Sequence, residues 1–128
     1  MILFRPDMAQ AILEGRKTVT RRRGKCRWRV GAIHLIYTRP PFSRNPGKPV
    51  ARVRIVSVTF ETSPGSSIAP LKGRDGLVRA KDIEAGREGF HSWGMFLGTY
   101  ALINGGSALR EDSYRVEFEL VDTKGAVR

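Results

Sequence analysis

The sequence has one cysteine, no long apolar run and few acidic residues in its first half. A single cysteine, Cys26, excludes an intrachain disulfide framework and a cysteine-rich zinc site. No apolar run approaches the roughly 20 residues that span a bilayer. Charged residues and a proline interrupt the N-terminus where a secretory signal would be apolar, at Arg5, Pro6 and Asp7. These absences predict a cytoplasmic protein without a membrane anchor.

Acidic residues are missing altogether between Glu14 and Glu61, and the basic residues gather in that gap. The chain carries 23 basic and 12 acidic residues, for a net charge of +11. Basic side chains bind phosphates and release counterions, and arginine also stacks on bases. The pattern therefore predicts a nucleic-acid or nucleotide ligand. A membrane surface is the alternative, but it would favour an amphipathic basic helix, whereas this stretch reads as strands and loops.

Hydrophobic periodicity predicts a mixture of helices and strands. We expect a short helix over residues 7–14, capped by Asp7 and ended by Gly15, and a second over 92–103, capped by Ser92. The expected strands are 17–22, 33–38, 50–60 and 114–120, with a bulge in the third of them where the apolar phase shifts. The expected loops are 39–49 and 62–79.

This order of elements favours an α+β fold: a small, mostly antiparallel β-barrel with two or three short helices packed around it. A length of 128 residues suffices for one hydrophobic core, so we expect a single domain over residues 1–128. Its last residues, from about 122, are expected to form a frayed tail. The aromatic residues of 92–103 lie at helical spacing and are expected in the core.

Residues 12–22 read ILEGRKTVTRR and carry the most specific motif of the chain. A helix end followed by G-R-K-T-x-T-x-R resembles the N-terminal signature of the ASCH (activating signal cointegrator homology) family. The resemblance continues through Val30-Gly31, residues 51–55, Glu88-Gly89-Phe90 and the terminal strand, so it covers nearly the whole chain. The layout is similar to small phage or bacterial members. The resemblance implies a barrel related to the PUA domain, an RNA-binding module, with a cleft lined by the GRKTVT segment.

The resemblance also implies activities. Some small members hydrolyse the amide of N4-acetylcytidine with a Lys, a Thr and a Glu, and others have been associated with RNA cleavage. Matched to this sequence, the catalytic residues are Lys17, Thr20 and Glu88, with no metal or cofactor. In that chemistry Lys17, its pKa lowered by burial or nearby cations, takes the Thr20 proton, and Glu88 protonates the leaving amine or holds the lysine. Lys17 and Thr20 would face opposite sides of a regular strand, so Lys17 is expected in an irregular turn after Gly15.

The same residues also suit binding without turnover. Lys17 and Arg22 can hold a phosphate or carboxylate while Thr18 and Thr20 donate hydrogen bonds, and Glu88 can simply occupy the first turn of a helix. Trp28 and Tyr37 are candidates for stacking on bases. The predicted nucleic-acid contacts are these two aromatics and Arg16, Arg21, Arg22, Arg23, Lys25, Arg27, Arg29, Arg52 and Arg54.

Other chemical groups give weaker signals. His34 and His91 would have to meet for acid–base cleavage of RNA, and nothing in the sequence brings them together. Cys26 has cationic neighbours but no evident base partner. The acidic residues are too scattered to predict a metal site.

Three hypotheses remain open: an N4-acetylcytidine amidohydrolase, a ribonuclease that acts on single-stranded RNA, and a non-catalytic nucleic-acid-binding adaptor. The expected partner is RNA, single-stranded rather than duplex, or a nucleoside, with DNA as an alternative. The protein is expected to be a monomer that needs no cofactor.

Overall fold

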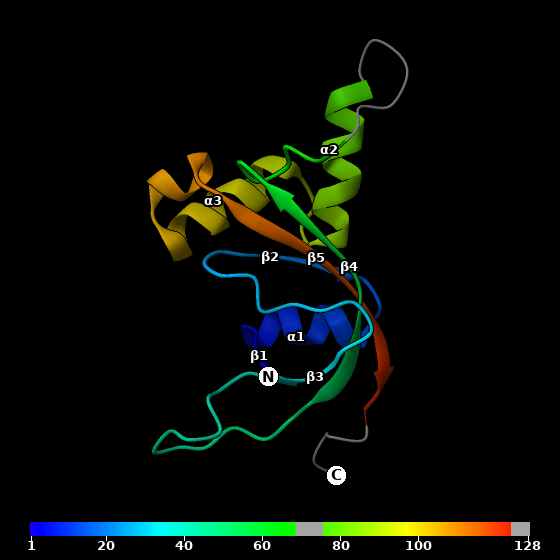
Figure 1. The fold of residues 1–128 in the computed structure, drawn as a ribbon, viewed down its shortest axis with the longest axis vertical. Coiled ribbons are helices and arrows are strands. Elements are labelled where there is room, and N and C mark those ends of the chain that lie inside the picture. Colours follow the sequence, from blue (N-terminus) through cyan, green and yellow to red (C-terminus); the bar gives the residue numbers. More distant parts are fainter. Residues whose placement is uncertain (69–75, 124–128) are drawn as a thin grey trace.

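The computed structural model describes residues 1–68 and 76–123. Its longest strands, β4 (Ala51–Glu61) and β5 (Ser113–Asp122), pair antiparallel and run through the length of the molecule (Figure 1). They are the centre of a five-stranded sheet with the order β1-β3-β4-β5-β2. β3 (Ile33–Tyr37) pairs antiparallel with β4, and β2 (Val19–Arg22) pairs antiparallel with β5. Only β1 (Ile2–Leu3) pairs in parallel, with β3, among the described strands. The sheet curves into a half-barrel whose edge strands are β1 and β2.

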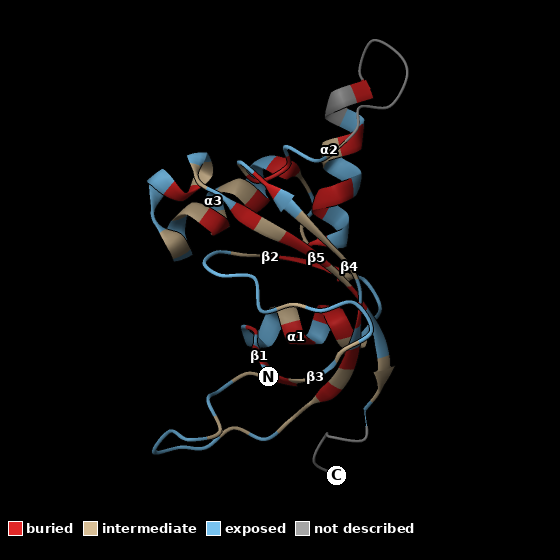
Figure 2. Cartoon of the chain, in the orientation of Figure 1, coloured by how far each residue is buried: buried red, intermediate tan, exposed pale blue. Residues whose placement is uncertain are grey.

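The helices lie at two places along the long strands. α1 (Pro6–Leu13) lies within the hollow of the curved sheet, whereas α2 (Gly76–Arg87) and α3 (Trp93–Asn104) lie towards its other end (Figure 1). A short 3₁₀ helix, η1 (Gly106–Arg110), connects α3 to β5. Buried residues alternate along the strands, so one face of the sheet packs inward (Figure 2).

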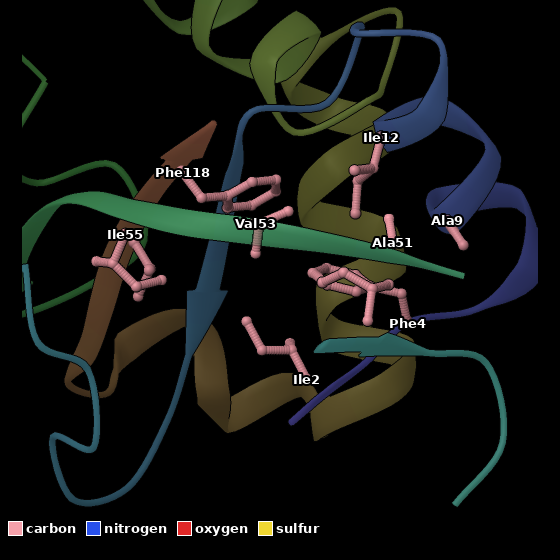
Figure 3. Close-up of a cluster of buried hydrophobic side chains, with 10 residues drawn as sticks. Ile2, Phe4, Ala9, Ile12, Ala51, Val53, Ile55 and Phe118 are labelled. Carbon is pink, nitrogen blue, oxygen red and sulfur yellow. The ribbon is translucent and has the colours of Figure 1, made fainter. Parts of the chain in front are cut away.

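This arrangement produces two hydrophobic cores. The larger lies between α1 and the sheet and includes Phe4, Ile12, Val53 and Phe118 (Figure 3). The smaller lies among α2, α3 and η1, and contains Ala85, Trp93, Phe96, Tyr100 and Ala108. The aromatic residues of α3 are therefore core, as their spacing predicts.

The structure confirms the α+β class and the mostly antiparallel sheet. The expected bulge is present, because the β4–β5 register shifts between Ile55 and Ser57. The side chain of Ser92 caps α3 by accepting from the Met95 amide, and Gly105 ends that helix with φ of 93°. β5 reaches Asp122, and residues 124–128 of the expected tail lie outside the described residues.

Two local predictions are wrong. Asp7 does not cap α1: the helix begins at Pro6 after Arg5, and Asp7 lies in the first turn, where its carboxylate pairs with the Arg5 guanidinium at 2.7 Å. The expected loop over 62–79 also extends too far, since α2 begins at Gly76. That helix escaped prediction because Glu84 stands on its buried side where an apolar residue would mark the face.

Candidate functional site

Glycines terminate both α1 and α2, and these two helix ends place Lys17 and Glu88 opposite each other. After α1, Gly15 adopts φ of 79°, and the amides of Gly15 and Arg16 bond to the carbonyls of Ile12 and Ala11. After α2, Gly89 adopts φ of 92° and repeats the pattern with Phe90. These are Schellman motifs, which satisfy the last carbonyls of a helix and turn the chain sharply. Glu88 thus ends a helix; the expectation that it occupies a first turn is wrong.

Lys17 lies in the irregular segment before β2, as expected, and its ammonium donates three hydrogen bonds. Nζ donates to the Val19 carbonyl at 2.8 Å, to the Glu88 carbonyl at 2.8 Å and to Glu88 Oε1 at 3.0 Å. Burial lowers the pKa of Lys17, Glu88 opposes this, and Arg22 and Arg21 lower it further. The three acceptors and the carboxyl end of α2 favour the protonated form, so this geometry presents Lys17 as a hydrogen-bond donor.

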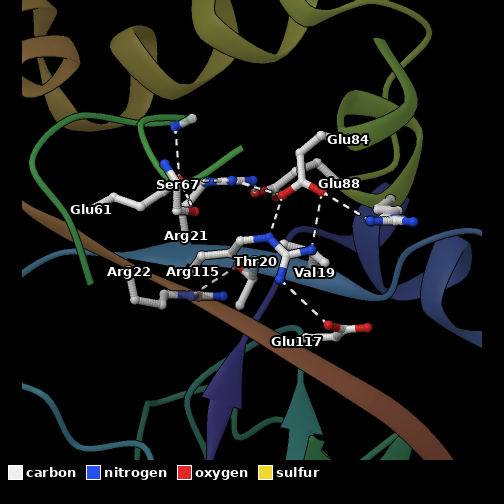
Figure 4. A network of polar contacts seen from close by, with 12 residues as sticks. Val19, Thr20, Arg21, Arg22, Glu61, Ser67, Glu84, Glu88, Arg115 and Glu117 are labelled. Carbon is white, nitrogen blue, oxygen red and sulfur yellow. Dashed lines mark hydrogen bonds and ion pairs between the residues drawn. The ribbon is translucent and has the colours of Figure 1, made fainter. Parts of the chain in front are cut away.

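Arg21 is the centre of a buried ionic network (Figure 4). Its guanidinium contacts Glu61 at 2.9 Å, Glu84 at 2.7 Å and Glu88 at 2.9 Å, and its side chain is 0% exposed. It also lies 5.5 Å from the Trp93 ring centre. Arg115 completes the network by binding Glu84 at 2.5 Å. The buried charges balance as Lys17, Arg21 and Arg115 against Glu61, Glu84 and Glu88.

The network holds Glu61 and Glu84 ionised. Burial raises the pKa of Glu61, but the hydrogen bonds and charge of Arg21, together with hydrogen bonds from Ser67, outweigh it and hold the pKa below its usual value. Burial likewise raises the pKa of Glu84, and Arg115 and Arg21 reverse the effect. Ionised carboxylates accept hydrogen bonds and cannot donate a proton, so Glu61 and Glu84 serve to hold the arginines.

A pocket of about 230 Å³ opens at the seam between the edge strands β1 and β2, against α3. The three predicted catalytic residues, Lys17, Thr20 and Glu88, all line it and are all buried. The apolar part of its walls includes Leu3, Phe4, Met8, Phe90, Phe96 and Ile103, and arginines, among them Arg22 and Arg23, also line it. The volume lies below the roughly 300–1,000 Å³ of pockets for drug-sized ligands, so the pocket suits one small group.

Arg22 lines this pocket and links β2 to β1. Its Nε donates to Thr20 Oγ1 at 3.2 Å, and its Nη2 donates to the Leu3 carbonyl at 2.9 Å. Thr20 thus receives its hydrogen bond from Arg22, and no bond joins Thr20 to the Lys17 ammonium among the described contacts.

Several arginines of the predicted nucleic-acid surface carry acidic partners. Arg16 pairs with Glu14, Arg23 with Glu111, Arg52 with Asp122 and Arg54 with Glu119. Arg21 has no exposed surface to offer a phosphate, so we leave it out of the proposed nucleic-acid contacts. Acids distant in the sequence cancel much of the charge that appears concentrated between Glu14 and Glu61.

Apart from half-buried Arg22, the remaining cations of that stretch are exposed, and none of them makes an ion pair with the described residues. They lie in two loops and are Lys25, Arg27, Arg29, Arg39, Arg44 and Lys48. Burial lowers the pKa of Arg22, Glu88 raises it, and the charge of Arg27 lowers it further. Arg23, which begins the first loop, lines the pocket, so this loop adjoins the pocket.

Trp28 and Tyr37, the predicted stacking residues, are half-buried. Trp28 packs against the larger core and lies edge-on to His34, with ring centres 5.4 Å apart. This packing occupies much of the Trp28 surface, and Tyr37 belongs to β3, where it pairs with Leu3 of β1. The pocket lining includes neither of them.

The weaker candidates stay apart in the described structure. His34 lies in β3, and exposed His91 precedes α3. Cys26 is exposed, and its thiol donates to the Trp28 carbonyl. No three metal-ligating side chains come together among the described residues, and none of the helices described there is long and apolar enough to span a membrane.

Sequence reasoning missed most of the buried network. Glu61, Glu84 and Arg115 were not candidates, because charged residues are expected at the surface unless partners are known. One signal was available: Glu84 lies one helical turn before Glu88 and directly before the buried Ala85, in phase with the inward face of α2.

Solved structures show which class of protein has this fold. The ASCH domain from Lactobacillus crispatus matches with a TM-score of 0.61 and 15% identity, over 90% of this chain and 70% of that one. The ASCH protein of Zymomonas mobilis matches with a TM-score of 0.55 and 20% identity, over 93% of this chain and 67% of its own. No protein-family model and no curated protein matches the chain.

The half-open α+β barrel therefore has the fold of an ASCH domain, as the motif of residues 12–22 predicts.

Proposed function

We propose that the protein binds single-stranded RNA and takes one unstacked base into the pocket at the β1–β2 seam. The observation that carries this proposal is a small pocket, apolar in its walls and polar at Lys17, Thr20 and Glu88, that opens beside an exposed basic loop. Single strands offer splayed bases to such pockets, whereas a duplex keeps its bases stacked. The carboxyl oxygens of Glu88 can accept from a base, and the Thr20 hydroxyl can donate to one.

The charge that remains after ion pairing supports a polyanionic ligand. Lys25, Arg27 and Arg29 lie in the loop after Arg22, are exposed, and lack acidic partners within the described residues. A strand with one base in the pocket would carry its adjoining phosphates across this loop. Phosphate contacts supply most of the affinity of such complexes and make it depend on salt.

The test is fluorescence anisotropy with a labelled single-stranded RNA, the same sequence as duplex, and the DNA equivalent, over a series of salt concentrations. We expect the single strand to bind more tightly than the duplex. Its log affinity should fall linearly with log salt, by about 0.7 for each phosphate neutralised. Absence of binding, or an affinity that salt does not change, would remove the proposal.

A second candidate function is hydrolysis of the amide of N4-acetylcytidine. The observation that favours it is that Lys17, Thr20 and Glu88 line one pocket of suitable size for a nucleobase. Thr20 Oγ1 would attack the acyl carbon as its proton passes to Lys17, and the amide C–N bond would break. Glu88 would orient Lys17, or receive that proton and pass it to the leaving amine, and a water molecule would then hydrolyse the acyl-threonine ester. For Lys17 to act as the base, its ammonium must lose a proton and exchange one of its three hydrogen bonds for Thr20.

The hydrolysis is tested by incubating the protein with N4-acetylcytidine and quantifying cytidine. Thr20→Val removes the hydroxyl with little change in shape and should abolish release, whereas Thr20→Ser keeps a hydroxyl and should retain part of it. If wild-type protein releases no cytidine above background, the amidohydrolase function is excluded. Shortening of a labelled RNA strand in the same mixture would instead support a ribonuclease, and binding without either change would leave an adaptor.

A further inference from the structure

Arg22 differs from the arginines around it, because no carboxylate of residues 1–68 and 76–123 pairs with it. Arg21 contacts three glutamates, and Arg5 and Arg23, which also line the pocket, pair with Asp7 and Glu111. The Glu88 carboxylate is already shared between Lys17 and Arg21. Arg22 is therefore the uncompensated positive charge of the pocket.

The orientation of the Arg22 guanidinium is also fixed by its contacts. It lies over the Phe4 ring, with its Cζ 4.7 Å from the ring centre. Its Nε and Nη2 donate to Thr20 Oγ1 and the Leu3 carbonyl, so contacts from β1, β2 and the residue after β1 orient it together. A group ordered in advance loses little conformational entropy when a ligand packs on it.

These contacts decide which part of Arg22 a ligand can use. Phe4 covers one face of the guanidinium, and protein oxygens occupy the edge formed by Nε and Nη2. That edge is one of the two that grip a phosphate with paired hydrogen bonds. The end of the guanidinium at Nη1 and the face turned away from Phe4 are left. The flat face of a guanidinium is a surface on which bases stack, and it is the part that an apolar-walled pocket favours.

We propose that Arg22 is the stacking platform for the unstacked base, giving the order Phe4, Arg22, base. The inference rests on the proposed RNA binding. It assigns Arg22 to the base, whereas other cations bind the phosphates. Stacking is tolerant of base identity, since every base has a π face. Any preference among bases then comes from the polar groups at Lys17, Thr20 and Glu88.

The experiment separates bases from phosphates. The probes are a fully abasic oligoribonucleotide and the same backbone with a single base at its centre, and the readout is the ratio of their dissociation constants. For wild type we expect the base to tighten binding about 5- to 150-fold, the range that stacking supplies. Arg22→Lys keeps the charge but loses the plane. It should bring the ratio close to one while the affinity for the abasic strand stays near the wild-type value.

Arg79→Lys makes the same exchange at an exposed arginine of α2 that is neither in the pocket lining nor among the predicted nucleic-acid contacts, and should leave the ratio unchanged. A second variant, Phe4→Leu, keeps an apolar side chain but removes the ring beneath Arg22, and should lower the ratio part of the way. Circular dichroism establishes that each variant is folded.

Three results would overturn the assignment. A ratio near one for wild type means that no base is recognised. A wild-type ratio that survives in Arg22→Lys places the base elsewhere. Loss of affinity for the abasic strand in Arg22→Lys, with the ratio intact, makes Arg22 a phosphate ligand. Failure of wild type to bind either strand is a separate outcome and contradicts the RNA-binding function itself.

Discussion

The segment of residues 21–29 contains two regions of similar composition and opposite environment. At its start, Arg21 is completely buried and neutralised by three glutamates. At its end, Arg27 and Arg29 are exposed and lack acidic partners among the described residues. Arg22 stands between the two, half-buried, with an aromatic ring and a carbonyl as its partners. The difference shows that the same side chain can join a buried ionic network or present charge to a ligand, depending on which acids the fold brings to it.

We expect the largest loss of stability from a substitution of Arg21, the buried residue at the start of this segment. Arg21→Met removes a cation and leaves Glu61, Glu84 and Glu88 facing one another without it. Breaking a buried ion pair in this way costs about 3–5 kcal/mol, because an uncompensated charge remains in the interior. We expect a loss of that size in the free energy of unfolding, measured by urea denaturation. The matched exchange Arg54→Met breaks an exposed pair and should cost about 0–1 kcal/mol. Equal losses in the two variants would contradict the comparison.

We expect the second largest loss of stability from acid, which protonates Glu61 and Glu84 of the same buried network. The pKa values of Glu61 and Glu84 are lower in the folded state than in the unfolded chain, so the unfolded chain binds more protons in acid. Their stabilisation is then complete above the ordinary glutamate pKa of about 4.3 and is lost as the pH falls through the folded values.

Urea denaturation from neutral pH down to below about pH 4 checks this prediction. Glu61→Gln should be less stable at neutral pH and should lose less stability on acidification, because one of the titrating groups is gone. Parallel pH profiles for wild type and variant would show that Glu61 has no lowered pKa.

We expect the smallest effect from a substitution of Arg27, an exposed residue near the end of this segment. Arg27→Ala should leave stability nearly unchanged and reduce the salt slope of RNA binding by about 0.7, the share of one phosphate on a single strand. Arg54→Ala, which removes an arginine already neutralised by Glu119, should leave that slope at its wild-type value. If both variants reduce the slope equally, ion pairing does not decide which arginines contact RNA.

Much of the fold could be predicted from local signals. The Ser92 cap, the Gly105 stop and the aromatic spacing between them define α3, and the shift of apolar phase near Val56 marks the bulge in β4. The helix α2 could not be predicted in the same way, since its buried face carries Glu84. Of the candidate site, Lys17, Thr20 and Glu88 follow from the motif, and the structure places all three in one pocket. Their chemical roles remain proposals.

The sequence by itself determined the class of fold, the motif of residues 12–22 and the excess of basic charge, because periodicity, glycine stops and composition are properties of neighbouring residues. Only the tertiary structure decided which of those charges are available. Glu61, Glu84, Glu88, Glu111, Glu119 and Asp122 are far along the chain from the arginines that they neutralise, with the partners Arg21, Arg23, Arg52 and Arg54. Coulombic attraction depends on distance in space, and the fold alone sets that distance.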